Sequence, residues 1–382
     1  MDPDLLTLGV LGTSSKENEF RLPIHPHHLG RIDGDLAGRI VLEQGYGERF
    51  GVSDEHLAEH VGAVLPREQV IHDADIVLLP KPVLADIEAM RHGQVLWGWP
   101  HAVQDPDLTQ LSIDKSLTLI AWEAMNHWTA DGEYMTHVFH RNNELAGYCS
   151  VLHALTLKGT TGHYGRRLRA VVIGFGNTAR GAITALQGLG IHDIVVLTTR
   201  DVTAVAAPVP GIWLEHMERV DGDPRRTVVY AEDGVVATHE LLAGFDVVVN
   251  CVFQDTDNPY MFVTATELAA FGPGSLIVDV SCDLGMGFEF ARPTSFEDPI
   301  FEVGDGVTYY GVDHSPTYLW NSATWDISEA LLPHLRSVMR GPAGWDEDVT
   351  VRRAIEIREG VIQNPKILSF QRRAEHHPHP PL

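Results

Sequence analysis

The sequence predicts an α/β protein with parallel sheets, divided into about two domains. Short apolar runs alternate with longer polar stretches, which is the rhythm of βα units. A glycine turn near the middle of the chain, within Val171–Ala182, has the form that follows the first strand of a dinucleotide-binding domain. The length of 382 residues is enough for two domains, each with its own core.

The composition excludes several classes of function. Fifty-two acidic side chains against 28 basic ones give a net charge of −24, which disfavours binding to nucleic acid through its phosphates. No apolar run reaches the ~18 residues of a membrane span, and the N-terminal segment lacks the basic start of a signal peptide. The three cysteines are too few and too scattered for a disulfide framework or a zinc site. We therefore expect a cytoplasmic protein without a metal site, a nucleic-acid partner or a membrane partner.

The first half of the chain contains a set of apolar runs, each long enough for one buried strand. They are residues 5–12, 38–43, 75–80, 94–99 and 117–122. Residues 142–158 contain few helix breakers, so we expect a helix there that bridges the two domains.

A second set of strands is expected in the other half, at residues 168–174, 192–198, 245–252, 275–281 and 307–312. Helices are expected at 323–340 and 348–361. The segment from Arg372 onward is rich in proline and histidine, which predicts a disordered tail.

The glycine turn has the pattern G-x-G-x-x-A. Gly174 permits the tight turn, Gly176 lets the backbone approach a pyrophosphate, and Ala179 allows close packing of helix on sheet. Asn177 and Thr178 begin the following helix, whose amides would face the phosphates. The alternative is a purely structural glycine turn.

The end of the next strand indicates which dinucleotide is bound. NAD enzymes usually place an acidic residue there, whereas this chain has Thr198, Thr199 and Arg200. Hydroxyls and a guanidinium suit a 2′-phosphate, so NADP(H) is favoured over NAD(H). In the alternative, Arg200 is a surface charge and Asp201 takes the acidic role. Cys251, in a later apolar run, is assigned both as a small core residue and as a cofactor contact.

Four chemically useful side chains follow four different strands, where open α/β sheets bind ligands. Arg21 can bind a substrate carboxylate, and Lys81 can hold a second oxygen and polarise a keto or imino group. His101 can transfer the proton that accompanies hydride transfer, and Asp283 can balance a developing cation or hold the nicotinamide ribose. Each has a structural alternative: a solvated charge for Arg21 or Lys81, a packed histidine for His101, and a helix N-cap for Asp283.

These residues lie in stretches that together resemble the alanine dehydrogenase/pyridine nucleotide transhydrogenase superfamily, with the N5-(carboxyethyl)ornithine synthase-like branch the most similar. The stretches appear in the family's order and include KENEFRLPIHP (16–26), LLPKP (78–82), WGWPHAVQDPDL (97–108), AWEAM (121–125), GFGNTA (174–179) and GSLIVDVSCDLGMGFE (274–289).

The resemblance implies two Rossmann-like lobes with the nucleotide domain inserted into the substrate domain. The boundaries are 1–145 for the first part of the substrate lobe, 146–312 for the NADP(H)-binding domain, 313–370 for the C-terminal return and 371–382 for a disordered tail. The family's substrate-binding arginine and lysine fall on Arg21 and Lys81, its catalytic histidine on His101, and its aspartate beside the nicotinamide on Asp283.

Two departures from simple alanine dehydrogenases favour the opine-forming branch, whose members use NADPH. Thr198 replaces an acidic residue, and the loop at 312–317 is unusual. In that loop Asp313 and His314 would recognise the amine of a second substrate, or else form a turn with a satisfied histidine.

The hypothesis is an NADPH-dependent reductase that condenses an amino acid, such as ornithine or lysine, with a 2-keto acid through an imine. Alternatives are deamination as in alanine dehydrogenase, saccharopine-type oxidation, and an NADP(H)-binding regulatory protein without turnover. Partners are small molecules, and a homo-oligomer is expected because two-lobed dehydrogenases are commonly oligomers.

Overall fold

The computed structural model describes residues 5–200, 209–231 and 234–382, and these form two compact units. The first unit combines the N-terminal part of the chain, to His140, with the C-terminal part from Trp320. The second unit, Arg141–Leu319, is inserted between them. Its boundaries lie a few residues outside those expected from the sequence.

The first unit contains a sheet whose order is β21-β20-β6-β5-β4-β1-β2-β3 among the described strands. The strands are β1 (Leu8–Val10), β2 (Ile40–Glu43), β3 (Ala63–Leu65), β4 (Ile76–Leu78), β5 (Val95–Gly98), β6 (Thr118–Ala121), β20 (Ile355–Arg358) and β21 (Val361–Ile362). β1 to β6 pair in parallel, so their carboxyl ends share one edge. The five strands expected in this half all exist, and β3 was not anticipated.

Short helices connect these strands and cover the sheet. They are α1 (Gly34–Ala37), α2 (Asp54–Leu57), α3 (Arg67–Asp73), α4 (Leu84–Ala89) and α5 (Pro106–Asp114), with a small hairpin of β7 (Asn126–Trp128) and β8 (Tyr134–His137). One core on this sheet is built from strand side chains such as Leu8, Ile76 and Trp97, each without exposed surface. The alternation of strand and helix follows the apolar rhythm of the sequence.

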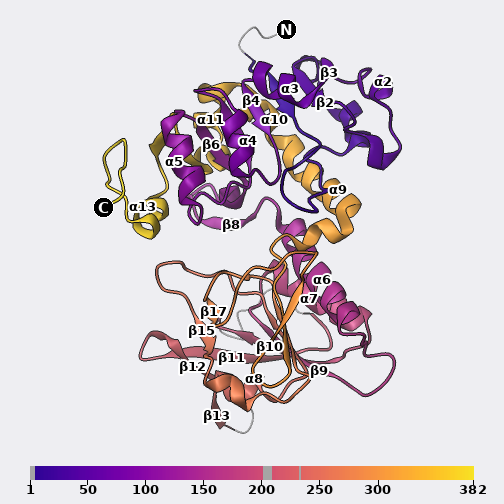
Figure 1. Cartoon of the computed structure of the whole chain (residues 1–382), viewed down its shortest axis with the longest axis vertical. Helices are drawn as coiled ribbons and strands as arrows, with labels where there is room; N and C mark the ends of the chain where they lie inside the picture. The colour runs from indigo at the N-terminus through magenta and orange to yellow at the C-terminus, as the bar shows by residue number, and fades with distance from the viewer. Residues whose placement is uncertain (1–4, 201–208, 232–233) are drawn as a thin grey trace. The chain divides into compact units, whose positions relative to one another are not determined.

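The C-terminal return segment completes this sheet, and Figure 1 shows it in orange and yellow beside the indigo and purple strands. It contains α9 (Trp320–Leu331), α10 (Leu335–Met339), α11 (Gly341–Glu347), α12 (Val349–Arg353) and α13 (Pro365–Gln371). The helix expected at 348–361 is wrong after Arg353, where β20 begins. Ile355 and Ile357 pair with β6 and are buried, so burial against the sheet prevails over the helical pattern.

The expected disordered tail is also wrong, because the last residues of the chain pack on the first unit. His379 is 1% exposed, and its Nε2 accepts a hydrogen bond from Ile362 N at 3.1 Å. The guanidinium of Arg373 donates to Gln110 Oε1 at 2.7 Å and is almost fully buried. These side-chain contacts anchor a segment whose composition alone predicts disorder.

The second unit contains a sheet of order β13-β12-β11-β10-β9-β14-β16-β19-β18 in the described part of the chain. The strands are β9 (Arg169–Ile173), β10 (Asp193–Thr198), β11 (Trp213–Val220), β12 (Asp223–Ala231), β13 (Gly234–Ala237), β14 (Val247–Asn250), β16 (Leu276–Asp279), β18 (Ile300–Val303) and β19 (Val307–Tyr310). The parallel series β11-β10-β9-β14-β16-β19 is the Rossmann order, which confirms the predicted fold class. The sequence did not predict β11, β12, β13 or β18; charged side chains interrupt the apolar pattern of β11 and β12, while β13 and β18 are only four residues long.

Two helices pack closely in this unit: α6 (His140–Leu157), at the expected bridging position, and α7 (Asn177–Gly188). A Cβ on Gly147 would lie 1.9 Å from the carbonyl oxygen of Thr178, and a Cβ on Gly181 would lie 1.7 Å from that of Glu144. The two backbones therefore approach one another at distances that only glycine allows. The unit also contains α8 (Thr238–Leu242), β15 (Met261–Val263) and β17 (Gly287–Phe288).

Within the described ranges, we find no helix with the length and apolar character needed to cross a membrane.

Candidate active site

In the first unit the candidate residues come from the carboxyl ends of adjacent parallel strands. Arg21 follows β1, Lys81 follows β4 and His101 follows β5. Because β1, β4 and β5 are neighbours in the sheet, their loops emerge at the same edge. This is the edge at which open α/β sheets bind ligands.

Lys81 and His101 are in direct contact. Lys81 Nζ lies 2.6 Å from His101 Nε2, which is hydrogen-bond distance. The Lys81 carbonyl accepts a hydrogen bond from Ser14 Oγ at 2.7 Å, which fixes the loop after β4. His101 has a φ of 49°, in the left-handed region that residues with a Cβ seldom occupy. Strain of this kind is often stored at functional sites.

Glu123 supports His101 and was missed as a functional residue in the sequence. It follows the next strand, β6, and its Oε1 accepts a hydrogen bond from the His101 main-chain N–H at 2.8 Å. Its Oε2 is buried and has no hydrogen-bond partner within the described part of the chain. Extending the strand-end rule to β6 would have identified this residue, since it lies in the segment AWEAM.

A second carboxyl group, Glu356 on β20, lies near Glu123. Its Oε1 accepts a hydrogen bond from Asn364 Nδ2 at 2.8 Å, and its buried Oε2 has no partner. Burial raises the pKa of both carboxyl groups, and the charge of Glu356 raises that of Glu123 further. Lys81 acts in the opposite direction, lowering the pKa of Glu123. The pair therefore favours a state with at least one proton.

Arg21 is buried and held in a fixed orientation by Glu19. Arg21 Nε lies 2.8 Å from Glu19 Oε1, and Nη2 lies 2.5 Å from Oε2. The guanidinium carbon lies 5.1 Å from the ring centroid of Trp99, two residues before His101. Arg21 is thus placed by a bidentate ion pair and an aromatic face rather than being a solvated charge.

In the second unit the glycine turn adopts the predicted strand–turn–helix form. Gly174 follows β9 with a φ of 97°, and α7 begins at Asn177. A Cβ on Gly174 would lie 3.3 Å from the carbonyl oxygen of Cys251, which places Cys251 beside the turn. Thr178 lies in the first turn of α7, and Ala179 is fully buried against the sheet.

The end of β10 carries the residues that bear on the choice of dinucleotide. Thr198 is buried, and its Oγ1 accepts a hydrogen bond from Arg200 N at 3.2 Å. Arg200 Nη2 donates to the carbonyl oxygen of Phe175, within the glycine turn, at 2.5 Å. Thr199 is exposed. Asp201, the alternative acidic residue, lies outside the described residues.

Asp283 follows β16 and is positioned by a buried network around Asp279. Asp279 Oδ1 accepts from Asn250 Nδ2 at 2.9 Å and from Cys282 N at 3.0 Å, while Oδ2 accepts from Tyr309 Oη at 2.9 Å. Cys282 has a φ of 44°, so this network holds a strained turn directly before Asp283. Burial raises the pKa of Asp283 to about 6.

Asp313 and His314 pair with each other after β19. His314 Nδ1 lies 2.5 Å from Asp313 Oδ1, and the imidazole is 1% exposed and lies edge-on to Phe296. This contact fits the alternative of a turn with a satisfied histidine, and recognition of an amine stays a proposal.

A group of possible metal ligands, which the sequence did not suggest, lies at α2. The ligand atoms of His56, Glu59 and His60 lie within 4.8 Å of one another, and two of the three residues are exposed. These three residues lie between β2 and β3, whereas the candidate active-site residues of this unit follow β1, β4 and β5.

Comparison with known proteins gives two family matches. Residues 11–138 match the alanine dehydrogenase/PNT N-terminal domain, and residues 155–365 match the corresponding C-terminal domain.

Individual relatives are distant but extend over most of the chain. An N(5)-(carboxyethyl)ornithine synthase from Clostridium botulinum is 24% identical over 84% of this chain and 91% of its own length. An alanine dehydrogenase from Mycobacterium tuberculosis is 24% identical over 93% of this chain and 94% of its own length.

Solved structures agree on the fold. An L-alanine dehydrogenase superposes with a TM-score of 0.72 at 20% identity, covering 96% of this chain and 99% of its own. A transhydrogenase from Sinorhizobium meliloti gives 0.70 at 20% identity, covering 93% and 99%.

Proposed function

Because the chain belongs to the alanine dehydrogenase/PNT family, we propose that it is an NADPH-dependent reductase that joins an amino acid to a 2-keto acid such as pyruvate. The observation that carries the proposal is the contact between Lys81 Nζ and His101 Nε2, 2.6 Å apart at strand ends. The relative named N(5)-(carboxyethyl)ornithine synthase supports ornithine or lysine as the amine.

The glycine turn fits a dinucleotide. Gly174 adopts the positive φ that the tight turn needs, and no described residue lies within 4 Å of the Cβ position of Gly176, which leaves room for a pyrophosphate. Arg200 has no carboxylate partner among the described residues, which supports NADPH over NADH. When bound, the nicotinamide supplies the hydride.

The substrate carboxylate would be held by Arg21 and Lys81. Glu19 and Trp99 fix the orientation of the Arg21 guanidinium, so that little side-chain entropy is lost when a carboxylate binds. The Lys81 ammonium donates to the keto oxygen and makes the carbonyl carbon more electrophilic.

Proton transfer would pass through His101. The free amine of the amino acid attacks the carbonyl, and the carbonyl oxygen leaves as water after taking protons from the Lys81–His101 pair. The resulting iminium accepts a hydride at carbon and becomes a secondary amine. Asp283, ionised at neutral pH, would supply a negative charge beside the nicotinamide ribose.

A second candidate function is oxidative deamination of a single amino acid. The relative named alanine dehydrogenase, similar over 93% of the chain, favours it. In that reaction ammonia takes the place of the second amino acid, and the same proton-transfer pair serves both reactions.

The test is an NADPH-oxidation screen of 2-keto acids against a panel of amino acids, with ammonium as one of the amines. Condensation predicts turnover that depends strictly on an amino acid, and a product mass equal to the sum of both substrates minus one oxygen atom. Turnover with ammonium and pyruvate alone, at a rate matching the best amino acid, would reject condensation in favour of deamination. The same panel with NADH tests the preference for NADPH.

A further inference from the structure

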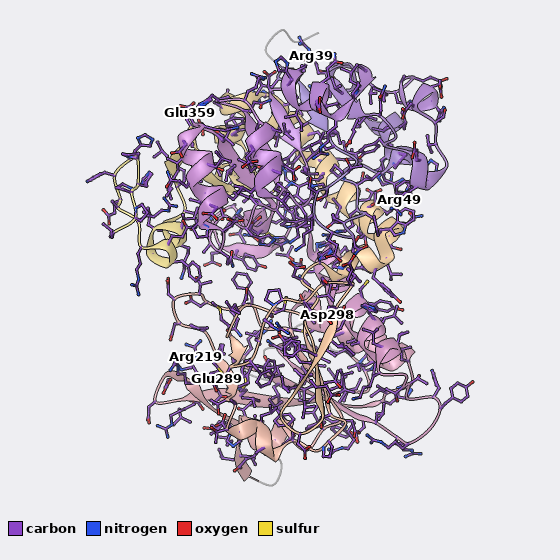
Figure 2. The ribbon with its side chains drawn as sticks, viewed as in Figure 1. Arg39, Arg49, Arg219, Glu289, Asp298 and Glu359 are labelled. Atoms are coloured by element: carbon purple, nitrogen blue, oxygen red, sulfur yellow. The ribbon has the colours of Figure 1, made fainter. Side chains whose placement is uncertain are left out.

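An open pocket lies next to the end of β10, and neither the sequence nor the comparisons assign it a role. It has a volume of about 500 Å³ and is lined by Thr199, His216, Met217, Glu218, Arg219, Gly222 and Tyr260. Figure 2 labels Arg219 beside the strands β11 and β12 of this unit. The pocket belongs entirely to the nucleotide-binding unit.

The pocket arises because β10 ends before its neighbour β11 does. Thr198, the last residue of β10, pairs with His216, while β11 continues to Val220. The last residues of β11 therefore pass beyond the end of β10 at the carboxyl edge of the sheet. In a Rossmann unit this is the edge where the adenosine ribose lies, beside the residue at the end of the second strand.

Arg219 has the surroundings of an anion-binding arginine. Its guanidinium carbon lies 4.1 Å from the ring centroid of Tyr260, and its buried Nε has no hydrogen-bond partner among the residues that the structure describes. In the part of the chain that the structure describes, it forms no ion pair with a carboxylate, although the protein carries a net charge of −24. Glu218 also lines the pocket, but its Oε2 accepts a hydrogen bond from Tyr230 Oη at 2.8 Å, toward β12.

His216 donates a hydrogen bond to the backbone just after β10. Its Nδ1 lies 3.2 Å from the carbonyl oxygen of Arg200, which cannot donate, so Nδ1 carries the hydrogen. Through this contact His216 also fixes the backbone of Arg200, whose side chain reaches back to the glycine turn.

We propose that Arg219 completes a subsite for the 2′-phosphate of NADPH together with Thr199 and Arg200, and that His216 holds the Arg200 backbone in place. Two guanidinium groups, neither with a carboxylate partner among the described residues, then flank a phosphomonoester on the ribose, and one of them lies over the ring of Tyr260. Cofactor choice is thus set from β11 as well as from the end of β10. This inference rests on the proposed function only in its choice of NADPH.

The test measures binding of NADPH and of NADH by isothermal titration calorimetry, which needs no turnover. Arg219→Gln should weaken NADPH binding by about tenfold or more and change NADH binding by less than about threefold. Arg219→Lys keeps the charge and should retain more of the preference. Arg226→Gln is the matched control, because this arginine lies on β12, pairs with Asp221 and does not line the pocket.

The outcomes separate this inference from the proposed function. If the wild-type protein prefers NADPH and Arg219→Gln keeps that preference, the subsite is wrong while the preference stands. If Arg219→Gln lowers the affinity for NADPH and for NADH equally, the subsite is also wrong, because Arg219 then contacts a part of the dinucleotide that both cofactors share. A wild-type protein that binds both cofactors equally overturns the NADPH preference and the subsite together. His216→Ala should shift the preference in the same direction as Arg219→Gln.

Discussion

Lys81 and His101, on loops after neighbouring strands of one sheet, place their side-chain nitrogens 2.6 Å apart. At this distance one nitrogen donates and the other accepts, so the pair can deliver a proton and keep a charge close to a substrate oxygen. The Glu123 carboxylate accepts a hydrogen bond from the main-chain N–H of His101, which fixes the backbone that carries this member of the pair.

Replacing either member of this pair should remove most of the activity. We expect His101→Ala and Lys81→Ala to lower kcat by about 10²- to 10⁴-fold, because each removes a group that transfers or stabilises a proton in the reaction. The measurement is steady-state NADPH oxidation with the best substrate pair from the screen. His92→Ala, at an exposed position, is the control and should leave kcat unchanged. Near wild-type turnover of His101→Ala would contradict the proton-transfer role.

The carboxyl pair Glu123–Glu356 should make the protein less stable at alkaline pH. The folded state raises the pKa of both groups above the ordinary value of 4.5, so their contribution to stability is complete below that value and is lost as the pH rises through the raised values. We expect the Tm of the wild-type protein to fall from about pH 5 to pH 9, and that of Glu356→Gln to fall less.

The control for this experiment is Glu359→Gln, an exposed glutamate on the turn after β20 that Figure 2 labels. It should follow the wild-type curve. Parallel Tm curves for Glu356→Gln and the wild-type protein would show that the pair does not hold a shared proton.

Two buried histidines should limit stability in acid. Burial lowers the pKa of His28 and of His137 from 6.5 to about 4. Their neutral forms therefore stabilise the fold above 6.5, and this contribution is lost as the pH falls toward 4. We expect the Tm to drop over this interval, and the drop to be smaller in His28→Gln, which has no proton to gain. An unchanged slope in that variant would assign the acid sensitivity to other groups.

The contact between α6 and α7 should tolerate no side chain at Gly181. A Cβ there would lie 1.7 Å from the Glu144 carbonyl oxygen, so Gly181→Ala must separate the two helices, at a cost of about 1–3 kcal/mol or more in the free energy of unfolding. Gly188→Ala in the same helix meets nothing within 4 Å and should be neutral or stabilising by up to about 1 kcal/mol. Urea denaturation of both variants provides the comparison, and equal stabilities would contradict the close packing.

Predictions that rested on local patterns were accurate for the parallel strands. The apolar runs around Val77, Leu96 and Ile277 form buried strands, and the glycine turn leads into α7 as expected. The strands β11 and β12 were missed because charged residues interrupt their apolar pattern, as at Glu215 and Glu218. The pairing partners of such strands cannot be read from a short segment.

The candidate site likewise contains residues that the sequence predicted and residues that it did not. Lys81 and His101 were identified because both follow strands, and the structure brings their side chains into contact. Glu356 could not have been found, since it lies more than two hundred residues from Glu123 in the chain and its segment was expected to be helical. The ion pair of Arg21 with Glu19 was likewise not predicted, although only one residue separates the two in the sequence.

By itself the sequence determined the α/β class, the nucleotide turn and the strand ends that carry chemistry, because these depend on apolar periodicity and on glycine geometry within a few residues. Only the tertiary structure shows that β20 pairs with β6 and that β11 extends beyond the end of β10. It also places Glu356 near Glu123 and Arg219 in the pocket beside β10. Those outcomes depend on the pairing of distant strands, and the free energy of such pairing comes from burial against partners that no local pattern specifies.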